Sequence, residues 1–253
     1  MHRLPLLLLL VLLGGCATLG LRSPVPEAER AEIQHIGVAG LLGTRHHAIL
    51  VGLTSIGNRY YAVDATEWDI DGLAIRSAIA AMTAQASWRV SPLDLQGRAA
   101  EAFHRGDDYR DPDREALRAL AAAQGMDTLV LLLPAADEGQ PDRAGGYGYQ
   151  AAFGIGGVSG CPYVQFIVEV VRVADGRRLG WDWVRDCDDA ADPGWRAAAE
   201  EYTAAEWAMV RESLDGQIRR GVTGALRWLE MTGGPAAGPG TDDTPPPGLF
   251  RRD

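Results

Sequence analysis

The sequence predicts an α/β fold in which helices pack on one mixed β-sheet, formed by residues 32–231. Three features favour this class. Strand-like and helix-like segments alternate along the chain. Residues 128–133 form a continuous apolar run, which is typical of a strand covered on both faces. Asp175-Gly176 joins two alternating segments in the manner of a β-hairpin. The length of 253 residues suffices for one large domain.

The amino-terminal end has the order of an export signal. A basic Met1-His2-Arg3 start precedes the Leu-rich run 4–13, which is too short to cross about 30 Å of hydrocarbon as a helix. Small residues follow at Gly14-Gly15, and Cys16 comes directly after them. The segment 13–16, Leu-Gly-Gly-Cys, resembles the lipobox of bacterial lipoproteins, in which the Cys is acylated on sulfur before the leader is removed.

This resemblance implies that residues 1–15 are a signal peptide, that Cys16 is lipidated, and that residues 16–31 are a tether. Ala17 stands where Asp would retain a lipoprotein in the inner membrane, so the resemblance implies the periplasmic face of the outer membrane. Two or three acyl chains make such an anchor stable. The alternative is an ordinary cleaved signal followed by a chance Cys.

The carboxyl-terminal residues 232–253 are rich in Gly and Pro and poor in apolar side chains. Such a composition predicts a disordered tail. The alternative is a Pro-rich partner segment around Pro245-Pro246-Pro247.

The first half of the domain alternates as an α/β fold requires. Residues 36–42 predict a strand, and residues 48–53 and 60–63 predict a hairpin that closes through Gly57-Asn58. An apolar stripe then predicts a helix that begins near Asp69 or Asp71. The stripe consists of Ile75, Ala78, Ile79 and Met82.

The second half continues the pattern. Residues 88–93 predict a strand, residues 95–103 are weakly helical, and Asp111-Pro112 predicts the start of a helix that ends at Gly125. The buried strand 128–133 follows. The Gly-rich residues 135–160 suggest an exposed excursion.

The end of the domain is predicted to be a hairpin and a helix. The hairpin comprises residues 163–173 and 179–184. The helix is indicated by apolar residues spaced by three or four. These are Trp207, Val210, Leu214, Ile218, Val222, Ala225 and Leu229.

This order of elements is similar to that of the curli-secretion lipoproteins, the lipoprotein activators of penicillin-binding proteins and the TolB amino-terminal domain. Residues 121–133 and 168–179 carry the likeness. The resemblance implies an α/β sandwich and a role in envelope assembly, with no catalytic centre to carry over. Curli channels have pore-forming strands, and residues 144–160 are the one place where the sequence could accommodate such an extension.

Cys161 and Cys187 are the only other cysteines, and an oxidising compartment favours a disulfide between them. If Asp175 and Gly176 form the turn, the numbers of cross-strand partners sum to 351. Cys187 then faces Val164, three residues from Cys161. Two free thiols are the alternative.

Other polar groups are weaker candidates. His46-His47 with His35 or His104 could bind a metal, but neighbouring strand residues point to opposite faces, which favours solvated loop histidines. Ser159 lies in an imperfect nucleophile-elbow pattern. The acidic residues 107–113 and 186–192 favour solvated charge. We therefore predict no catalytic, metal or cofactor site.

The formal net charge of -10 becomes -11 in the mature chain, because removal of residues 1–15 takes away Arg3. An acidic surface repels nucleic acid, so the membrane attachment must come from the lipid. The predicted function is a non-catalytic binding or envelope-assembly module that contacts another envelope component through sheet edges, the Gly-rich excursion or the tail. The tryptophans favour core or hairpin anchors, although Trp181 and Trp183 would share one hairpin face, and an exposed pair could contact a partner. The alternatives are a periplasmic hydrolase and an oligomeric secretion-channel subunit.

Overall fold

The computed structural model describes residues 22–83, 87–103, 112–135, 145–154 and 156–232. The predicted signal peptide, Cys16, His104 and the carboxyl-terminal tail lie outside these ranges. The helices are α2 (Glu27–Glu32), α3 (Ile70–Met82), α4 (Arg114–Ala123) and α5 (Ala204–Trp228). The strands are β1 (His35–Gly40), β2 (Arg45–Val51), β3 (Arg59–Asp64), β4 (Arg89–Pro92), β5 (Thr128–Pro134), β6 (Gly146–Gly154), β7 (Gly157–Arg172) and β8 (Arg178–Cys187).

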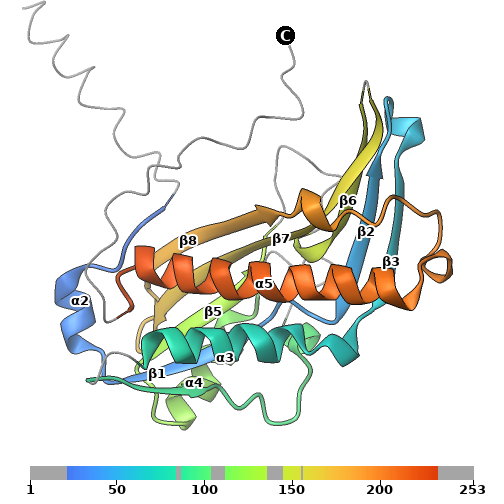
Figure 1. Cartoon of the computed structure of the whole chain (residues 1–253). Helices are drawn as coiled ribbons and strands as arrows, with labels where there is room; N and C mark the ends of the chain where they lie inside the picture. The colour runs from blue at the N-terminus through green and yellow to red at the C-terminus, as the bar shows by residue number, and fades with distance from the viewer. Residues whose placement is uncertain (1–21, 84–86, 104–111, 136–144, 155, 233–253) are drawn as a thin grey trace, which may run out of the picture.

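All eight strands form one mixed sheet in the order β3-β2-β6-β7-β5-β1-β4, with β8 paired to β7. Strand β1 is parallel to β4 and β5, and β2 is parallel to β6. The long strand β7 pairs first with β6 and then with β5 along one edge, while β8 occupies its other edge. The predicted mixed α/β architecture is confirmed (Figure 1).

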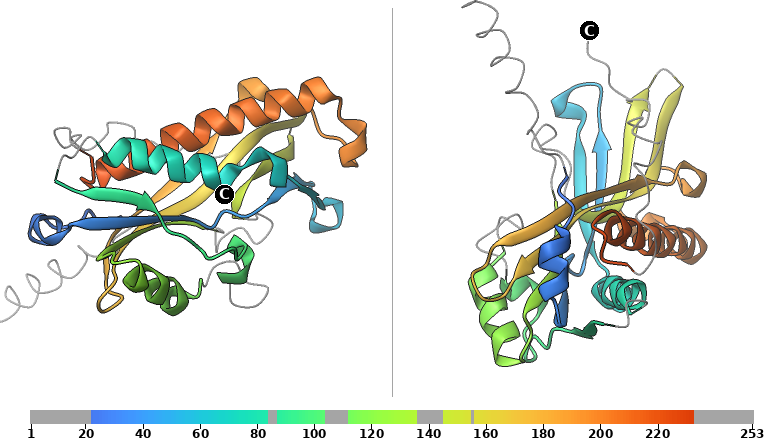
Figure 2. Two further views of the ribbon diagram at one scale, coloured as in Figure 1. Left: turned by 90° about the horizontal axis from the view of Figure 1, so that it is seen from below. Right: turned by 90° about the vertical axis from the view of Figure 1, so that its left-hand side faces the viewer.

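The sheet is covered on both faces. Helices α3 and α5 lie side by side on one face, and α4 lies on the other (Figure 2). Alternate residues of β5 enter the two cores: Val130 and Leu132 pack below α3 and α5, and Leu129, Leu131 and Leu133 pack below α4. This double coverage explains the continuous apolar run that predicted a buried strand.

Helix α5 begins at a capping box. The Thr203 side chain accepts a hydrogen bond from the Glu206 backbone, and the Glu206 side chain accepts one from the Thr203 backbone. Its predicted apolar stripe is buried at Val210, Leu214 and Ile218. At α4 the cap differs from the prediction: Asp113, not Asp111, accepts a hydrogen bond from the Ala116 backbone. None of the described helices has the length and apolarity that crossing a membrane requires.

The predicted excursion 135–160 contains two paired strands, since residues 146–154 and 157–160 belong to β6 and β7. The expected exposure is wrong for residues 146–149, which are buried, whereas residues 153–154 and 156–159 are exposed as expected. Tyr147 and Tyr149 are buried at 0% and 1% exposure. Two of the glycines in these strands allow close packing. A Cβ on Gly148 would lie 2.0 Å from the carbonyl oxygen of His47, and one on Gly160 would lie 2.3 Å from the Tyr149 hydroxyl.

The chain departs from the expected tether over residues 22–31. Ser23 pairs with Trp181 at the outer edge of β8, and Val25 is 2% exposed in the core. Helix α2 follows, where Arg30 forms an ion pair with Glu230. Residues 22–31 show no periodic apolar pattern in the sequence, because Val25 is the one buried side chain among them.

The β7–β8 register is one residue from the prediction, since Cys187 faces Tyr163 and not Val164. The connection is longer than a two-residue turn: Gly176 has φ +74° and its amide donates to the carbonyl of Arg172. A bulge opposite Val170/Val171 shifts the register again.

Gly148→Ala tests the close packing of β6 on β2. We expect a loss of about 1–3 kcal/mol in the free energy of unfolding, because the new methyl group must displace backbone. Urea unfolding provides the measurement. Gly156→Ala in the same hairpin is the matched control, since a Cβ added there would have no atom within 4 Å. Equal midpoints for both variants would contradict the argument.

Candidate functional site

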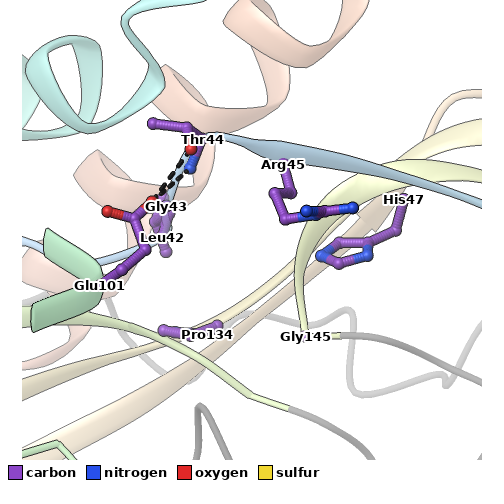
Figure 3. A pocket seen from close by; sticks show the side chains of 8 residues that line it. All are labelled: Leu42, Gly43, Thr44, Arg45, His47, Glu101, Pro134 and Gly145. Carbon is purple, nitrogen blue, oxygen red and sulfur yellow. Dashed lines mark hydrogen bonds between the residues drawn. The ribbon is translucent and has the colours of Figure 1, made fainter. Parts of the chain in front are cut away.

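A shallow pocket opens where β1 and β5 end (Figure 3). Strands β4 and β5 lie on either side of β1. Helix α3 precedes β4 and helix α4 precedes β5, and the two helices cover opposite faces of the sheet, so the direction of the strand order changes at β1. Ligands of α/β sheets commonly bind at such an edge. The lining residues are Leu42, Gly43, Thr44, Arg45, His47, Glu101, Pro134 and Gly145. The pocket has a volume of about 10 Å³, which is the lower limit for one water molecule.

Two carboxylates brace the backbone of this edge. Asp71 accepts hydrogen bonds from the amides of Leu42 and Gly43 at 2.7 and 3.2 Å. Glu101 accepts from the amide and hydroxyl of Thr44 at 3.1 and 3.0 Å. Burial raises the pKa of Asp71 to about 7, and the two amide donors oppose that rise. Both acids therefore hold the turn between β1 and β2.

Arg45 and His47 line the same pocket (Figure 3). The Nδ1 atom of His47 lies 2.8 Å from the Tyr60 hydroxyl. Burial, with a smaller effect from the Arg45 charge, lowers the pKa of His47 to about 4, so its imidazole is neutral at pH 7. One guanidinium beside a neutral imidazole can bind an acceptor group, but it provides no nucleophile with an activating base.

His46 points to the opposite face of β2 and is completely buried. Its ring lies 5.3 Å from those of Trp68 and Trp207 and 6.4 Å from that of Tyr147. Neither ring nitrogen has a hydrogen-bond partner among the described residues. Burial, and then the charge of His47, lower the pKa of His46 to about 3. The interpretation of the pair as solvated loop histidines was therefore wrong, although the two rings do occupy opposite faces as expected.

The third histidine is distant from this pair. The Nε2 atom of His35 lies 3.1 Å from the Ser91 hydroxyl, at the paired ends of β1 and β4.

Cys161 and Cys187 form a disulfide, with their Cα atoms 5.6 Å apart. It joins β7 to the end of β8, and the Gln150 amide donates to the sulfur of Cys187 at 3.1 Å. Asp189 lies close enough to both sulfurs to suggest a metal group. Sulfurs bonded to each other have no thiolate to offer a metal.

Two carboxylates of the acidic segment 186–192 attach this segment to the rest of the domain. Asp192 accepts hydrogen bonds from the Tyr149 hydroxyl and the Gly160 amide, and Asp188 accepts one from the Ser213 hydroxyl. Ser159 is exposed in β7 opposite Ala152, and so does not stand at a strand-to-helix turn. The acidic residues 107–111 lie outside the described ranges.

Trp181 and Trp183 share one face of β8, as predicted, and both are partly exposed. Each carries an arginine over its ring: Arg178 at 5.4 Å from Trp181, and Arg185 at 5.3 Å from Trp183. We name these four residues the Trp–Arg face. The sequence indicated the tryptophans but not Arg178, because only the β-bulge brings it to their side.

The Trp–Arg face is bordered by a buried acid. Glu169, directly opposite Trp181 on β7, is 3% exposed. Its carboxylate accepts a hydrogen bond from Arg114 of α4 at 2.9 Å and lies 3.9 Å from Arg178. Glu169 thus holds Arg178 beside Trp181.

No model of a known protein family matches the chain, and no curated protein sequence matches it. Among solved structures, a Xanthomonas campestris protein of the family DUF330 is 10% identical, over 82% of this chain and 90% of that one, with a TM-score of 0.38. The PelC dodecamer of Paraburkholderia phytofirmans gives 12% identity, 80% and 92% coverage, and a TM-score of 0.31. Lipoprotein GNA1162 of Neisseria meningitidis gives 13% identity, 73% and 97% coverage, and a TM-score of 0.29. Because these TM-scores are below 0.5, the similarities do not extend any function to this chain.

His46→Phe should remove an acid sensitivity of the fold. The unfolded chain binds a proton at this histidine near pH 6.5 and the folded chain only near pH 3, so stability is complete above pH 6.5 and decreases as the pH falls toward 3. Between pH 8 and pH 5 the histidine should cost about 2 kcal/mol. Denaturant unfolding of both proteins at both pH values isolates this difference, and parallel profiles would refute it.

The double variant C161A/C187A should lose stability. The disulfide closes a loop with a sequence separation of 26, which corresponds to about 3 kcal/mol in the chain-entropy model. Thermal unfolding with and without reductant provides the test: reductant should lower the midpoint of the natural chain and leave that of the double variant unchanged. Alkylation of both cysteines in the untreated natural chain would show that the disulfide does not form.

Proposed function

We propose that the protein is a periplasmic lipoprotein of the outer membrane, anchored through Cys16, which acts as a non-catalytic binding module in envelope assembly. The order of charge, apolar run, small residues and Cys in residues 1–16 supports the anchor. The Trp–Arg face supports the binding role and is the observation on which the proposal depends.

The Trp–Arg face has the composition of a binding surface. Tryptophan and arginine are the residues that most often dominate the energy of protein interfaces. Here the indole rings and guanidinium groups already stack within one chain, so little side-chain entropy remains to be lost on binding. Its two arginines stand on a chain with a net charge of -10. The two arginines would therefore attract an acidic protein surface locally, although the net negative charge of the chain repels it elsewhere.

The face also lies on an exposed edge of the sheet. Strand β8 pairs with β7, and within the described residues its outer edge carries a single bridge, from Ser23 to Trp181. Unpaired strand edges present backbone donors and acceptors that a partner can use. A partner that binds the face can thus also reach backbone groups of β8.

A hydrolase is less well supported by the described residues. Their carboxylates around the edge pocket hold backbone amides, and Ser159 stands in a strand without the turn that would expose a nucleophile. The secretion-channel alternative requires contacts between copies of this chain. The following experiment separates these possibilities.

Photocrosslinking in intact envelopes tests the proposed function. A photoreactive phenylalanine at Trp183 should form a defined adduct with an envelope protein, whereas the same group at exposed Arg219 on α5 should not. The charge reversals Arg178→Glu and Arg185→Glu should reduce the adduct several-fold, and Arg219→Glu should leave it unchanged. The mass of the amino-terminal peptide from the same preparation should show an acylated Cys16.

The other outcomes have distinct meanings. Adducts formed only between copies of the chain would favour the channel subunit. A lack of adducts, together with turnover of a glycan or peptide, would favour the hydrolase. An unmodified Cys16 would remove the anchor.

A further inference from the structure

Exposed apolar side chains gather at one end of the molecule. Of the six large hydrophobic residues exposed by 36% or more among the described residues, five lie in or beside two hairpin tips, and the sixth is Met209 on α5. They are Leu53 at 84%, Ile56 at 87%, Tyr60 at 60%, Phe153 at 40% and Val158 at 42%. Figure 1 shows the β2–β3 and β6–β7 hairpins projecting together beyond the helices.

The two tips are held next to each other by the sheet. Strand β2 runs parallel to β6, and their pairing continues to Val51 opposite Ala152. Residues 52–58 follow Val51, whereas Phe153 and Gly154 follow Ala152 and pair with Val158 and Gly157. The two tips therefore lie at the same level, side by side.

Both tips lack charge. Neither residues 52–58 nor residues 152–160 include Asp, Glu, Lys or Arg, although 23% of the whole chain is charged. The first charge beyond them is Arg59, whose guanidinium donates to the carbonyls of Ile56 and Asn58 at 3.1 and 2.9 Å. Exposed apolar groups with no charged side chain among them mark a site that meets an apolar phase or partner.

We propose that the two tips insert together into the interfacial region of a lipid membrane. This inference depends on the anchor in the proposed function. Arg22 follows Cys16 by six residues, a span of about 20 Å when extended, which keeps the domain near the lipid surface. Because the chain is acidic, anionic headgroups do not attract it, and the contact must be made by apolar side chains.

The residues at the base of the tips fit this environment. Tyr60 is amphipathic and 60% exposed, and Arg59 has a long apolar stem that can leave its charge among headgroups. The tips carry glycines, exposed apolar side chains and a few small polar residues, and they lack the charged side chains that commonly contribute to the polar rim of a protein interface. Their backbone polar groups limit them to the interface, where water still satisfies hydrogen bonds.

Depth-dependent fluorescence tests this insertion on the full-length lipidated protein in phosphatidylcholine vesicles. An environment-sensitive fluorophore is attached to I56C, V158C or R219C; the native sulfurs do not react, since Cys16 is acylated and Cys161 is bonded to Cys187. We expect a blue-shifted emission and strong quenching by lipids with brominated acyl chains at I56C and V158C. The control R219C, on exposed α5, should show neither.

A second substitution gives the proposal a further test. Leu53 is 84% exposed, so Leu53→Asp should leave the fold intact, and it should reduce the quenching at I56C at least two-fold, whereas Leu53→Ala should reduce it less. Quenching at I56C that is equal to that at R219C would overturn the proposal. A blue shift without quenching would overturn it as well, because it would show that a protein, including a second copy of this chain, covers the tips.

Failure of this inference is distinguishable from failure of the proposed function. Flotation with the vesicles and the mass of the amino-terminal peptide report on the Cys16 anchor, independently of the fluorophore. Crosslinking at Trp183 reports on the partner.

Discussion

The structure depends on the pairing of β7 along both of its edges. Its sixteen residues bind β6 and β5 in succession on one side and β8 on the other. The first part of β7 extends the sheet toward the projecting hairpins, and the second part lies between the two apolar cores. One strand therefore couples the tips, the aromatic surroundings of His46 and the Trp–Arg face, so that a change in its register would move all three.

Much of this fold could be predicted because its apolar patterns are periodic. The apolar residues of α5 are spaced as in a helix that packs on a sheet. The continuous apolar run of β5 is typical of a strand in a sheet that is covered on both faces. The prediction failed for β6 and the start of β7. Gly148 and Gly160 allow close backbone approach there, but in the sequence such glycines cannot be distinguished from glycines of a loop. The fold class therefore followed from periodicity, and the extent of the sheet did not.

The candidate surfaces were predictable only in part, since they depend on irregularities. Trp181 and Trp183 are two residues apart in a strand, which places them on one face. Arg178 reaches the same face only because of a β-bulge, and the amino-acid sequence does not predict that bulge. His46 and His47 were expected to point apart, and they do. Their environments depend on Trp68 and Trp207, residues distant in sequence from β2.

The two proposed contacts restrict how the domain can lie on a membrane. Ser23 bridges to Trp181, so the anchor proposed at Cys16 would connect to the domain beside the Trp–Arg face. On β7, Glu169 faces Trp181 and Val158 lies at the opposite end, a separation of about 36 Å at about 3.3 Å per residue. A single lipid tether would leave the domain free to rotate, whereas attachment at both ends of β7 would fix its long axis along the membrane. Because orientation is then determined before a partner arrives, less rotational entropy is lost when the partner binds the Trp–Arg face.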